Sequence, residues 1–275
     1  MINLARRPGP MRHNHGSNPA ARTKPVAGTP AARLPRRPDR GHEEASLNAT
    51  TSADLFDDVL TEKLEHVRSE LMDEYLQPHD HPWVIGYSGG KDSTVVVHLV
   101  LEMLLELPRS ERHRAVHIVS NDTLVESPLV VGHIEKTMRR FAEAAAALRL
   151  PVDVEITRPD PDHTFWVNLI GRGYPSPSRS FRWCTDRMKI LPTSRYIRGQ
   201  AAITGQVILL LGVRREESAA RAARVARYSR EAGGARLNPH NDLQGCLVFR
   251  PIVDLTTDEV WELLGTLAPP WGGTH

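Results

Sequence analysis

The chain has 275 residues, of which 40% are hydrophobic and 25% are charged, as in an ordinary globular protein. No apolar run reaches the roughly 18 residues needed to cross a bilayer. The first residues lack the continuous apolar h-region of a secretory signal, so we expect none. The two cysteines, Cys184 and Cys246, are too few for a disulfide framework and fit a reducing compartment. We therefore expect a cytoplasmic protein without a membrane segment.

The first 45 residues differ from the rest of the chain. Residues 1–42 hold nine Arg or Lys and one acidic residue, so they carry +8 of a total charge of +2 and leave the remainder at −6. Rich in proline and poor in large apolar groups, residues 1–45 cannot bury enough surface to offset their ordering entropy. We expect a disordered basic tail over 1–45 and one folded domain over 46–275. The tail is a nucleic-acid-binding arm, a mitochondrial presequence, or the product of a start codon placed too far upstream.

Within that domain, apolar periodicity predicts alternating helices and strands. Helices are expected at about 52–75, 92–106 and 127–148, and strands at 83–87, 115–120, 152–157 and 207–211. Strands that alternate with long helices indicate βαβ units and a parallel sheet. The predicted fold is therefore α/β, with a parallel sheet of about five strands and helices on both faces. Residues 159–205 look irregular, as active-site insertions often do.

A six-residue loop follows the first predicted strand: Ser88, Gly89, Gly90, Lys91, Asp92 and Ser93. Its glycines allow a tight turn, and the N–H groups at the start of the next helix attract anions. The serine hydroxyls and the Lys91 ammonium add donors for a phosphate. It is not a Walker A loop, because Ile85 and Asp92 stand where that pattern needs Gly and Ser or Thr. A phosphate site is favoured over an incidental turn with a surface lysine.

This loop resembles that of the PP-loop ATP pyrophosphatases, whose SGGKDS segment holds the pyrophosphate of ATP. The resemblance implies an adenine nucleotide alpha-hydrolase-like fold, binding of ATP with Mg²⁺, and release of pyrophosphate through a transient adenylate. It also implies that all six loop residues bind the nucleotide. Lys91 and Asp92 would be catalytic, with Asp92 positioning the loop or the magnesium ion.

Further segments resemble the phosphoadenylylsulfate reductase and sulfate adenylyltransferase branch. Gly212, Arg214 and the following acidic residues match its G-x-R-x-x-E-S segment, which implies that Gly212 and Arg214 face the nucleotide. Cys184 and Lys189 match a C-x-x-x-x-K stretch. Pro251 to Trp261 match a closing signature in which we expect Trp261 to pack in the core. Three more arginines (Arg221, Arg224 and Arg227) continue a basic stripe after Arg214.

The closest resemblance is to the sulfurtransferases of the Dnd DNA-phosphorothioation system, from about residue 53 to the C-terminus. It is carried by residues 120–123, 126–128, 182–185 and 269–273. It implies that ATP adenylates a DNA phosphate, and that sulfur from a cysteine desulfurase then replaces an oxygen. DNA, the desulfurase and other Dnd complex proteins would be partners. Asp122 and Thr123 would lie near the nucleotide, although Asp122 could equally cap a turn.

The chain departs from that family in its cysteines. The Dnd sulfurtransferases are iron–sulfur proteins with several cysteines downstream of the nucleotide domain, whereas only Cys184 and Cys246 stand here. Two thiolates cannot supply the four ligands of a cubane cluster, so the chain looks C-terminally truncated. Cys184 would be a cluster ligand, a catalytic persulfide carrier or a structural thiol. Cys246, followed by Leu247, Val248 and Phe249, is expected in the core.

The stretch 172–198 has seven basic residues against one acid, with aromatic residues interleaved. Such a surface suits nucleic acid, and a solvated loop is the equal alternative. The main hypothesis is thus a Dnd-type ATP-dependent sulfurtransferase. A phosphoadenylylsulfate (PAPS) reductase is the rival enzyme, although its Glu-Cys-Gly nucleophile segment is absent. A non-catalytic ATP-binding remnant of the modification complex is the rival from another class.

Overall fold

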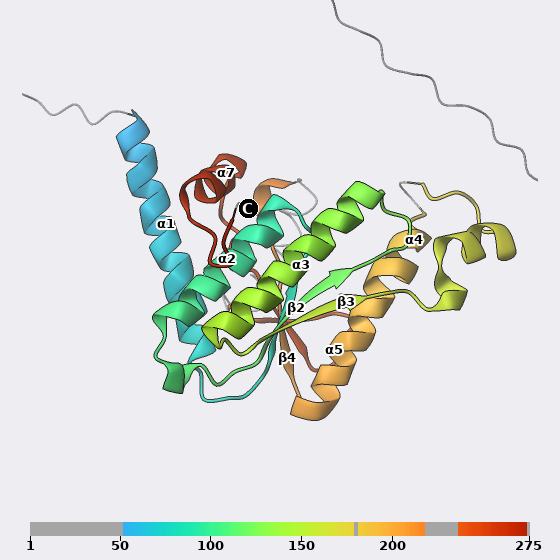
Figure 1. The fold of residues 1–275 in the computed structure, drawn as a ribbon, viewed down its shortest axis with the longest axis horizontal. Helices are drawn as coiled ribbons and strands as arrows, with labels where there is room; N and C mark the ends of the chain where they lie inside the picture. Colours follow the sequence, from blue (N-terminus) through green and yellow to red (C-terminus); the bar gives the residue numbers. More distant parts are fainter. Residues whose placement is uncertain (1–51, 179–180, 218–235, 274–275) are drawn as a thin grey trace, which may run out of the picture. The chain divides into compact units, whose positions relative to one another are not determined.

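The structure is a computed structural model that describes residues 52–178, 181–217 and 236–273, with side chains placed from residue 58 onward (Figure 1). The chain divides after Ala49, and all described residues belong to the second unit. The predicted disordered tail and the stripe of Arg221, Arg224 and Arg227 lie outside the described residues. No helix in the described part is long and apolar enough to cross a membrane.

Helices and strands alternate along the described chain, as predicted. In chain order they are α1 (Ser52–Tyr75), β1 (Trp83–Gly86), α2 (Lys91–Glu106), η1 (Arg109–Glu111), β2 (Val116–Asn121), α3 (Pro128–Leu148), β3 (Val152–Thr157), η2 (Pro161–His163), η3 (Val167–Gly171), α4 (Trp183–Thr185), η4 (Asp186–Ile190), α5 (Leu191–Thr204), β4 (Val207–Leu210), η5 (Arg215–Glu217), β5 (Asn238–Pro239), β6 (Cys246–Phe249) and α7 (Thr257–Thr266).

The strands form one six-stranded sheet in the order β3-β2-β1-β4-β6-β5. All neighbours are parallel except β5, which pairs with β6 in the antiparallel sense. Trp83 of β1 stands opposite Val116 of β2 on one side and Ile208 of β4 on the other. The chain reverses its direction of winding at β1, and ligands of such sheets bind outside the carboxyl ends of strands at that point. The α/β prediction is confirmed.

Helices cover both faces of the sheet, which explains why the central strands are apolar throughout. On one face α2 contacts β1, and α1 and α7 contact α2 in turn, while α3 covers β3. On the other face Ile197 of α5 packs against side chains of β1, β2 and β4: Val84, Val119, Val207 and Leu209. β1 therefore ends between two helical layers, and this is where the loop lies.

Three elements differ from the prediction. Residues 159–205 are not irregular throughout, because residues 183–204 form one helical run through α4, a π turn (η4) and α5. Only Pro192, Ser194 and Ile197 of α5 are buried, so the sequence shows no clear apolar stripe. The strands β5 and β6 were not predicted: β5 has only two residues, and Cys246 to Phe249 of β6 were predicted to lie in the core without being assigned to a strand.

The helix α7 begins at a capping box. The Thr256 hydroxyl accepts a hydrogen bond from the Glu259 amide at 3.3 Å, and the Glu259 carboxylate accepts one from the Thr256 amide at 2.7 Å. Lys63 of α1 donates to the same carboxylate at 2.6 Å. The expectation that Trp261 packs in the core is wrong: Val260 and Leu263 face inward, whereas Trp261 is 59% exposed.

Candidate nucleotide site

The six-residue loop lies where β1 gives way to α2. Gly89 has a φ of +74°, in the left-handed region that favours glycine, and Gly90 is the N-cap residue of α2. The Ser93 hydroxyl donates to the Gly90 carbonyl at 2.9 Å and accepts a hydrogen bond from the Ser88 amide at 3.2 Å. These bonds close the loop on itself. The first turn of α2 follows the loop directly. Its N–H groups have no carbonyl partner within the helix and point outward, where they can bind an anion.

Three charged side chains meet at the start of α2. Lys91 Nζ lies 2.9 Å from Asp92 Oδ2, and Arg214 Nε donates to Asp92 Oδ1 at 2.6 Å. The Arg214 side chain is 2% exposed and also donates to the Leu255 carbonyl and the Thr257 hydroxyl. The resemblance implied that Arg214 faces the nucleotide. The structure places its guanidinium on Asp92, where it ties α2 to the start of α7.

Gly212 stands in close contact with the same turn. A methyl group built on Gly212 would lie 2.7 Å from the Asp92 carbonyl carbon and 2.9 Å from the Ser93 amide nitrogen. Only glycine fits this approach of the segment after β4 to the backbone of α2. The contact of Gly212 is thus with the loop helix, and its predicted contact with a nucleotide stays a prediction.

A cavity of about 260 Å³ opens beside the loop at the carboxyl ends of β1 and β2; we call it the strand-end cavity. Its lining includes Gly86, Tyr87, Ser88, Ser120, Asn121, Glu126, Val130, Ile134, Lys189 and Thr193. Asn121 is fixed in this wall, because its side-chain oxygen accepts hydrogen bonds from the hydroxyls of Thr157 and Thr193, both at 2.8 Å. The volume lies just below the usual range of ligand pockets, which is roughly 300–1,000 Å³.

Asp122 and Thr123 follow β2 as expected. The lining of the strand-end cavity, however, includes Asn121 before them and Glu126 after them, and neither Asp122 nor Thr123. Asp122 Oδ1 accepts a hydrogen bond from the Leu124 amide at 3.0 Å, and Leu124 has a φ of +62°. Its other oxygen accepts one from Arg158 Nε at 3.0 Å. Thr123 is buried and its hydroxyl lies 3.3 Å from Glu126 Oε1. Asp122 therefore makes the turn-capping contact that was the alternative for it.

The sequence did not single out Lys189 or Thr193 as parts of this wall. Lys189 pairs with Glu126 at 3.3 Å, so a charged pair from two segments closes one side of the strand-end cavity. Cys184 is half-buried on α4, at the start of the same helical run. A rise of about 1.5 Å per residue puts Cys184 about 7 Å along the axis from Lys189. Cys184 thus lies on the carboxyl side of the sheet, where the loop is.

The second cysteine lies elsewhere. Cys246 is the first residue of β6, at the amino edge of the sheet, and is buried as predicted. Burial raises the pKa of its thiol to about 11. Among the residues that the structure describes, no three His, Cys, Asp or Glu side chains form a group that could hold a metal ion. The iron–sulfur cluster implied by the resemblance therefore does not fit the described residues.

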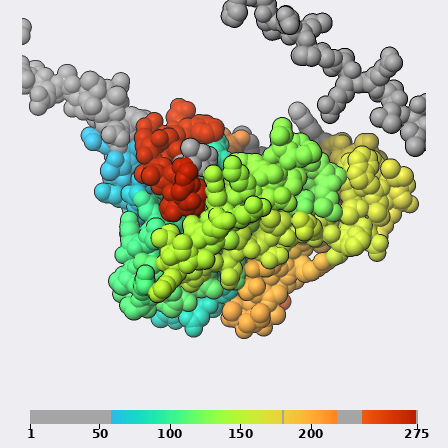
Figure 2. Space-filling view, in the orientation of Figure 1, coloured from blue at the N-terminus to red at the C-terminus, as the bar shows by residue number. Residues whose placement is uncertain are grey.

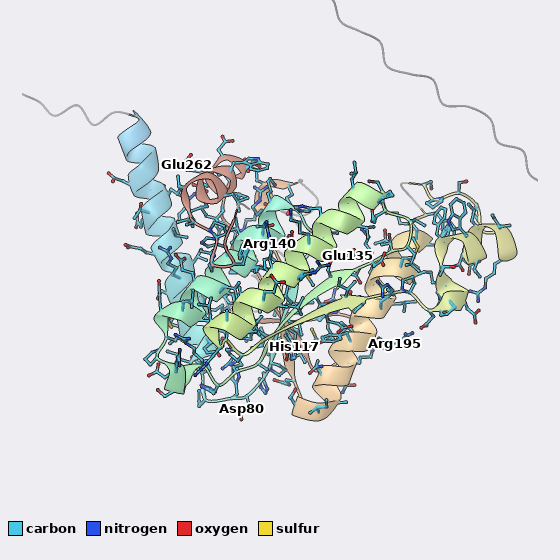
Figure 3. The ribbon with its side chains drawn as sticks, viewed as in Figure 1. Asp80, His117, Glu135, Arg140, Arg195 and Glu262 are labelled. Carbon is cyan, nitrogen blue, oxygen red and sulfur yellow. The ribbon has the colours of Figure 1, made fainter. Side chains whose placement is uncertain are left out.

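The insertion between β3 and α5 has an aromatic centre and a basic exterior. Phe165 and Trp183 stack with their ring centres 5.3 Å apart, and the Trp183 indole donates to the Pro175 carbonyl at 2.9 Å. Trp166 is 58% exposed, and Arg182 is exposed. Two other cations of the stretch have acidic partners: Lys189 pairs with Glu126, and Arg195, labelled in Figure 3, binds Asp160 at 2.6 Å.

The sequence matches a known family. The model of the phosphoadenosine phosphosulfate reductase domain matches residues 82–270, which is more than half of the chain and spans the sheet from β1 to the end of α7. The chain therefore belongs to this family, and with it to the PP-loop ATP pyrophosphatase superfamily that the loop predicted. Members of the family are enzymes of the PP-loop ATP pyrophosphatase type.

Individual relatives are distant. An uncharacterised protein of Methanocaldococcus jannaschii is 26% identical over 143 residues, which are 52% of this chain and 25% of that protein. The chain thus spans about a quarter of the length of this curated relative. A PAPS reductase of Candida auris, solved as a phosphate complex, is 14% identical to this chain. The match covers 78% of this chain and 86% of the reductase chain, with a TM-score of 0.45. The U34-tRNA thiolase NcsA of Methanococcus maripaludis, solved with its 4Fe–4S cluster, is 15% identical. That match covers 75% of this chain and 62% of the thiolase chain, also with a TM-score of 0.45.

Proposed function

We propose that the chain binds ATP, cleaves it between the α- and β-phosphates, and adenylates a DNA phosphate so that sulfur can replace one of its oxygens. The observation that carries the proposal is the junction of the Ser88–Ser93 loop with the strand-end cavity. Ser88 belongs to both. Pyrophosphate over the loop and adenosine in the cavity would together place the α-phosphate at their boundary.

The charges at the loop suit this task. In the structure Asp92 has two cationic partners, Lys91 and Arg214. When the triphosphate arrives, Lys91 can turn toward it while Arg214 still neutralises Asp92. No carboxylate is then left unpaired in a largely buried position, which would be strongly unfavourable. Lys91 and the hydroxyls of Ser88 and Ser93 would stabilise the charge that develops on the departing pyrophosphate.

Magnesium would enter with the nucleotide. Both oxygens of Asp92 already face a cation, at 2.9 Å and 2.6 Å, so the carboxylate does not fit a direct metal ligand in this arrangement. Mg²⁺ usually keeps several waters and binds substrate phosphates, and when bound it compensates phosphate charge. The role of Asp92 is therefore to hold Lys91 and Arg214 in place.

The adenylate step gives sulfur transfer a good leaving group. An oxygen of the DNA phosphate attacks the α-phosphorus of ATP, and pyrophosphate leaves. A persulfide on Cys184, loaded by a cysteine desulfurase, then attacks the activated DNA phosphorus, and AMP leaves. A thiol of a separate reductant then attacks Cys184 Sγ, which breaks the S–S bond, forms a mixed disulfide with Cys184 and leaves the outer sulfur on the DNA. A second thiol of the reductant reduces that disulfide and restores Cys184. Cys184 is the described thiol on the carboxyl side of the sheet, which supports this role.

The insertion supplies a surface for DNA. Trp166 and Phe181 are exposed at 58% and 46%, and Arg172 and Arg182 are exposed among them. Aromatic rings stack on bases and arginines bind phosphates, and this combination supports nucleic acid over a small sulfonucleotide as the acceptor. The stack of the half-buried Phe165 on the buried Trp183 holds the surface in shape.

The test measures pyrophosphate release from ATP and Mg²⁺ with duplex DNA, with adenylylsulfate, and with neither. We expect stimulation by DNA, and we expect Arg182→Ala to reduce the slope of log affinity for DNA against log salt by about 0.9. Arg109→Ala removes another exposed arginine, from the segment before β2 at the opposite edge of the sheet, and is the matched control. Sulfite release from a sulfonucleotide without ATP cleavage would support a PAPS reductase instead, and no turnover of either would support a remnant.

A further inference from the structure

A second cavity, of about 440 Å³, lies on the other side of the loop, between α2, α3 and α7. Figure 2 shows α7 and α3 next to each other on this face of the molecule. Tyr87 lines both cavities, whereas the other described lining residues differ. The volume exceeds that of the strand-end cavity and falls within the range of ligand pockets, roughly 300–1,000 Å³. We call it the helix-side cavity.

Its walls are aromatic. Trp271 is 7% exposed and its ring meets Phe141 edge-on at 4.8 Å, so this indole is held firmly in place. Trp261 lies at the exposed rim, and the exposed residue His133 of α3 also lines the cavity. Indole and imidazole faces bind planar heteroaromatic rings by stacking. A tryptophan left so exposed on an otherwise amphipathic helix is explained if its ring contacts a ligand.

The floor and one end of the cavity are polar. The buried Tyr87 lines the cavity together with Thr94 and Thr137, whose hydroxyls donate to the carbonyls of Gly90 and His133. At the loop end stands Lys91, whose ammonium shares the Asp92 carboxylate with Arg214. Arg214 also pairs with Glu216 at 3.1 Å, so the four groups are neutral together, and Lys91 is the cation that lines the cavity. The site thus offers stacking surfaces, hydroxyl groups and a cation at one end.

We propose that the helix-side cavity is a second binding site, and that it takes a purine nucleotide with its base against Trp261 and Trp271 and its phosphate toward Lys91. This site is separate from the strand-end cavity proposed for ATP. It also shares Gly89 and Lys91 with the loop, so its occupancy and ATP binding affect each other's affinity by the same factor. The nucleotide comes either from the free pool or from the end of a nucleic-acid strand.

Figure 3 identifies the helices that hold the site: Glu262 stands on α7 and Arg140 on α3. Arg140 also approaches the segment after Trp271, because a methyl group built on Gly273 would lie 3.1 Å from Arg140 Nη1. The aromatic wall is therefore held from both helices. Replacement of the exposed Trp261 leaves this framework in place, so the variant tests binding rather than folding.

The test titrates GMP into the full chain, with and without saturating α,β-methylene-ATP and magnesium, and follows tryptophan fluorescence and calorimetric heat. We expect GMP to bind and to quench the emission, and Trp261→Ala to weaken binding about tenfold, as for one lost ring stack. Ile203→Ala removes an exposed apolar side chain from the last turn of α5, outside both cavities, and is expected to leave GMP binding unchanged. Thermal unfolding checks that both variants fold.

Competition identifies the source of the nucleotide. Displacement of GMP by a 5′-phosphorylated trinucleotide assigns the site to a strand end, and failure of the trinucleotide to displace GMP assigns it to free nucleotides. Three results would overturn the proposal: no binding of GMP, equal GMP affinity in Trp261→Ala and wild type, or displacement of GMP from the Trp261 site by the ATP analogue. The last result would mean that the helix-side cavity holds the adenine of ATP.

Discussion

Replacement of Gly212 by alanine probes the contact between the segment that follows β4 and the first turn of α2, which carries the Ser88–Ser93 loop. The new methyl group would lie 2.7 Å, 2.8 Å and 2.9 Å from three backbone atoms of Asp92 and Ser93. Carbon contacts prefer about 3.5–4.0 Å, and helix backbone cannot rotate away as a side chain can. Overpacking of this kind costs about 1–3 kcal/mol, and we expect the upper end, about 3 kcal/mol. Because the displaced turn carries the loop, ATP affinity should fall more than tenfold.

Urea unfolding measures the stability change, and calorimetry with ATP measures the affinity. Gly132→Ala in α3 is the matched control, because nothing lies within 4 Å of its added methyl group. A helical glycine replaced by alanine should stabilise the protein by about 0.5–1 kcal/mol without altering ATP binding. Wild-type stability and ATP affinity in Gly212→Ala would refute the conclusion that close packing on α2 requires this glycine.

Further predictions concern other buried groups. Arg214→Met removes the buried partner of Asp92 and should lower the free energy of unfolding by roughly 3 kcal/mol; an unchanged urea midpoint would contradict this. Iodoacetamide at pH 8 should label the half-buried Cys184 in the native chain, and Cys246, whose thiol pKa burial raises to about 11, only after unfolding; equal labelling by peptide mass spectrometry would be evidence against it. Burial lowers the pKa of His117 below 6.5, so the unfolded chain takes the proton first and stability should decrease as the pH falls from 7 through 6.5. His117→Gln should reduce this dependence in urea titrations, and an identical pH profile would count against it.

Most of the fold could be read from the sequence because its central strands and long helices have strong patterns. The run from Trp83 to Gly86 is continuously apolar, as strands buried on both faces are, and α2 follows a glycine-rich turn. Other elements gave no comparable signal. The strand β5 has two residues, and α5 buries few side chains. The strand β6 is as long as β1, but its apolar run was predicted only to be buried.

The loop was predictable and the walls around it were not. Ser88 to Ser93 form a contiguous segment whose residue types fit a phosphate, so sequence alone locates it. Asn121, Lys189 and Thr193 come together only because β2 and the helical run 183–204 meet beside β1. Pairings across such sequence separations depend on tertiary packing. Trp261 was misassigned because a closing signature that includes a large aromatic residue suggests a core position, whereas the helix turns the adjacent Val260 inward and leaves Trp261 exposed.

The contact of Arg214 with Asp92 also lay beyond sequence reasoning, since it joins residues 122 positions apart. The G-x-R pattern indicated that the arginine matters but not what it touches. The structure supplies a physical reason for both members of the pattern: Gly212 allows the approach to α2, and Arg214 then reaches the carboxylate.

The products of ATP cleavage test the central claim most directly. The purified chain is incubated with ATP, Mg²⁺ and duplex DNA, and anion-exchange chromatography separates pyrophosphate, phosphate, AMP and ADP. We predict pyrophosphate release that is lost in Lys91→Ala and retained in Lys136→Ala, which removes an exposed lysine from α3. Release of phosphate and ADP, or pyrophosphate release that survives Lys91→Ala, would contradict ATP cleavage at the Ser88–Ser93 loop.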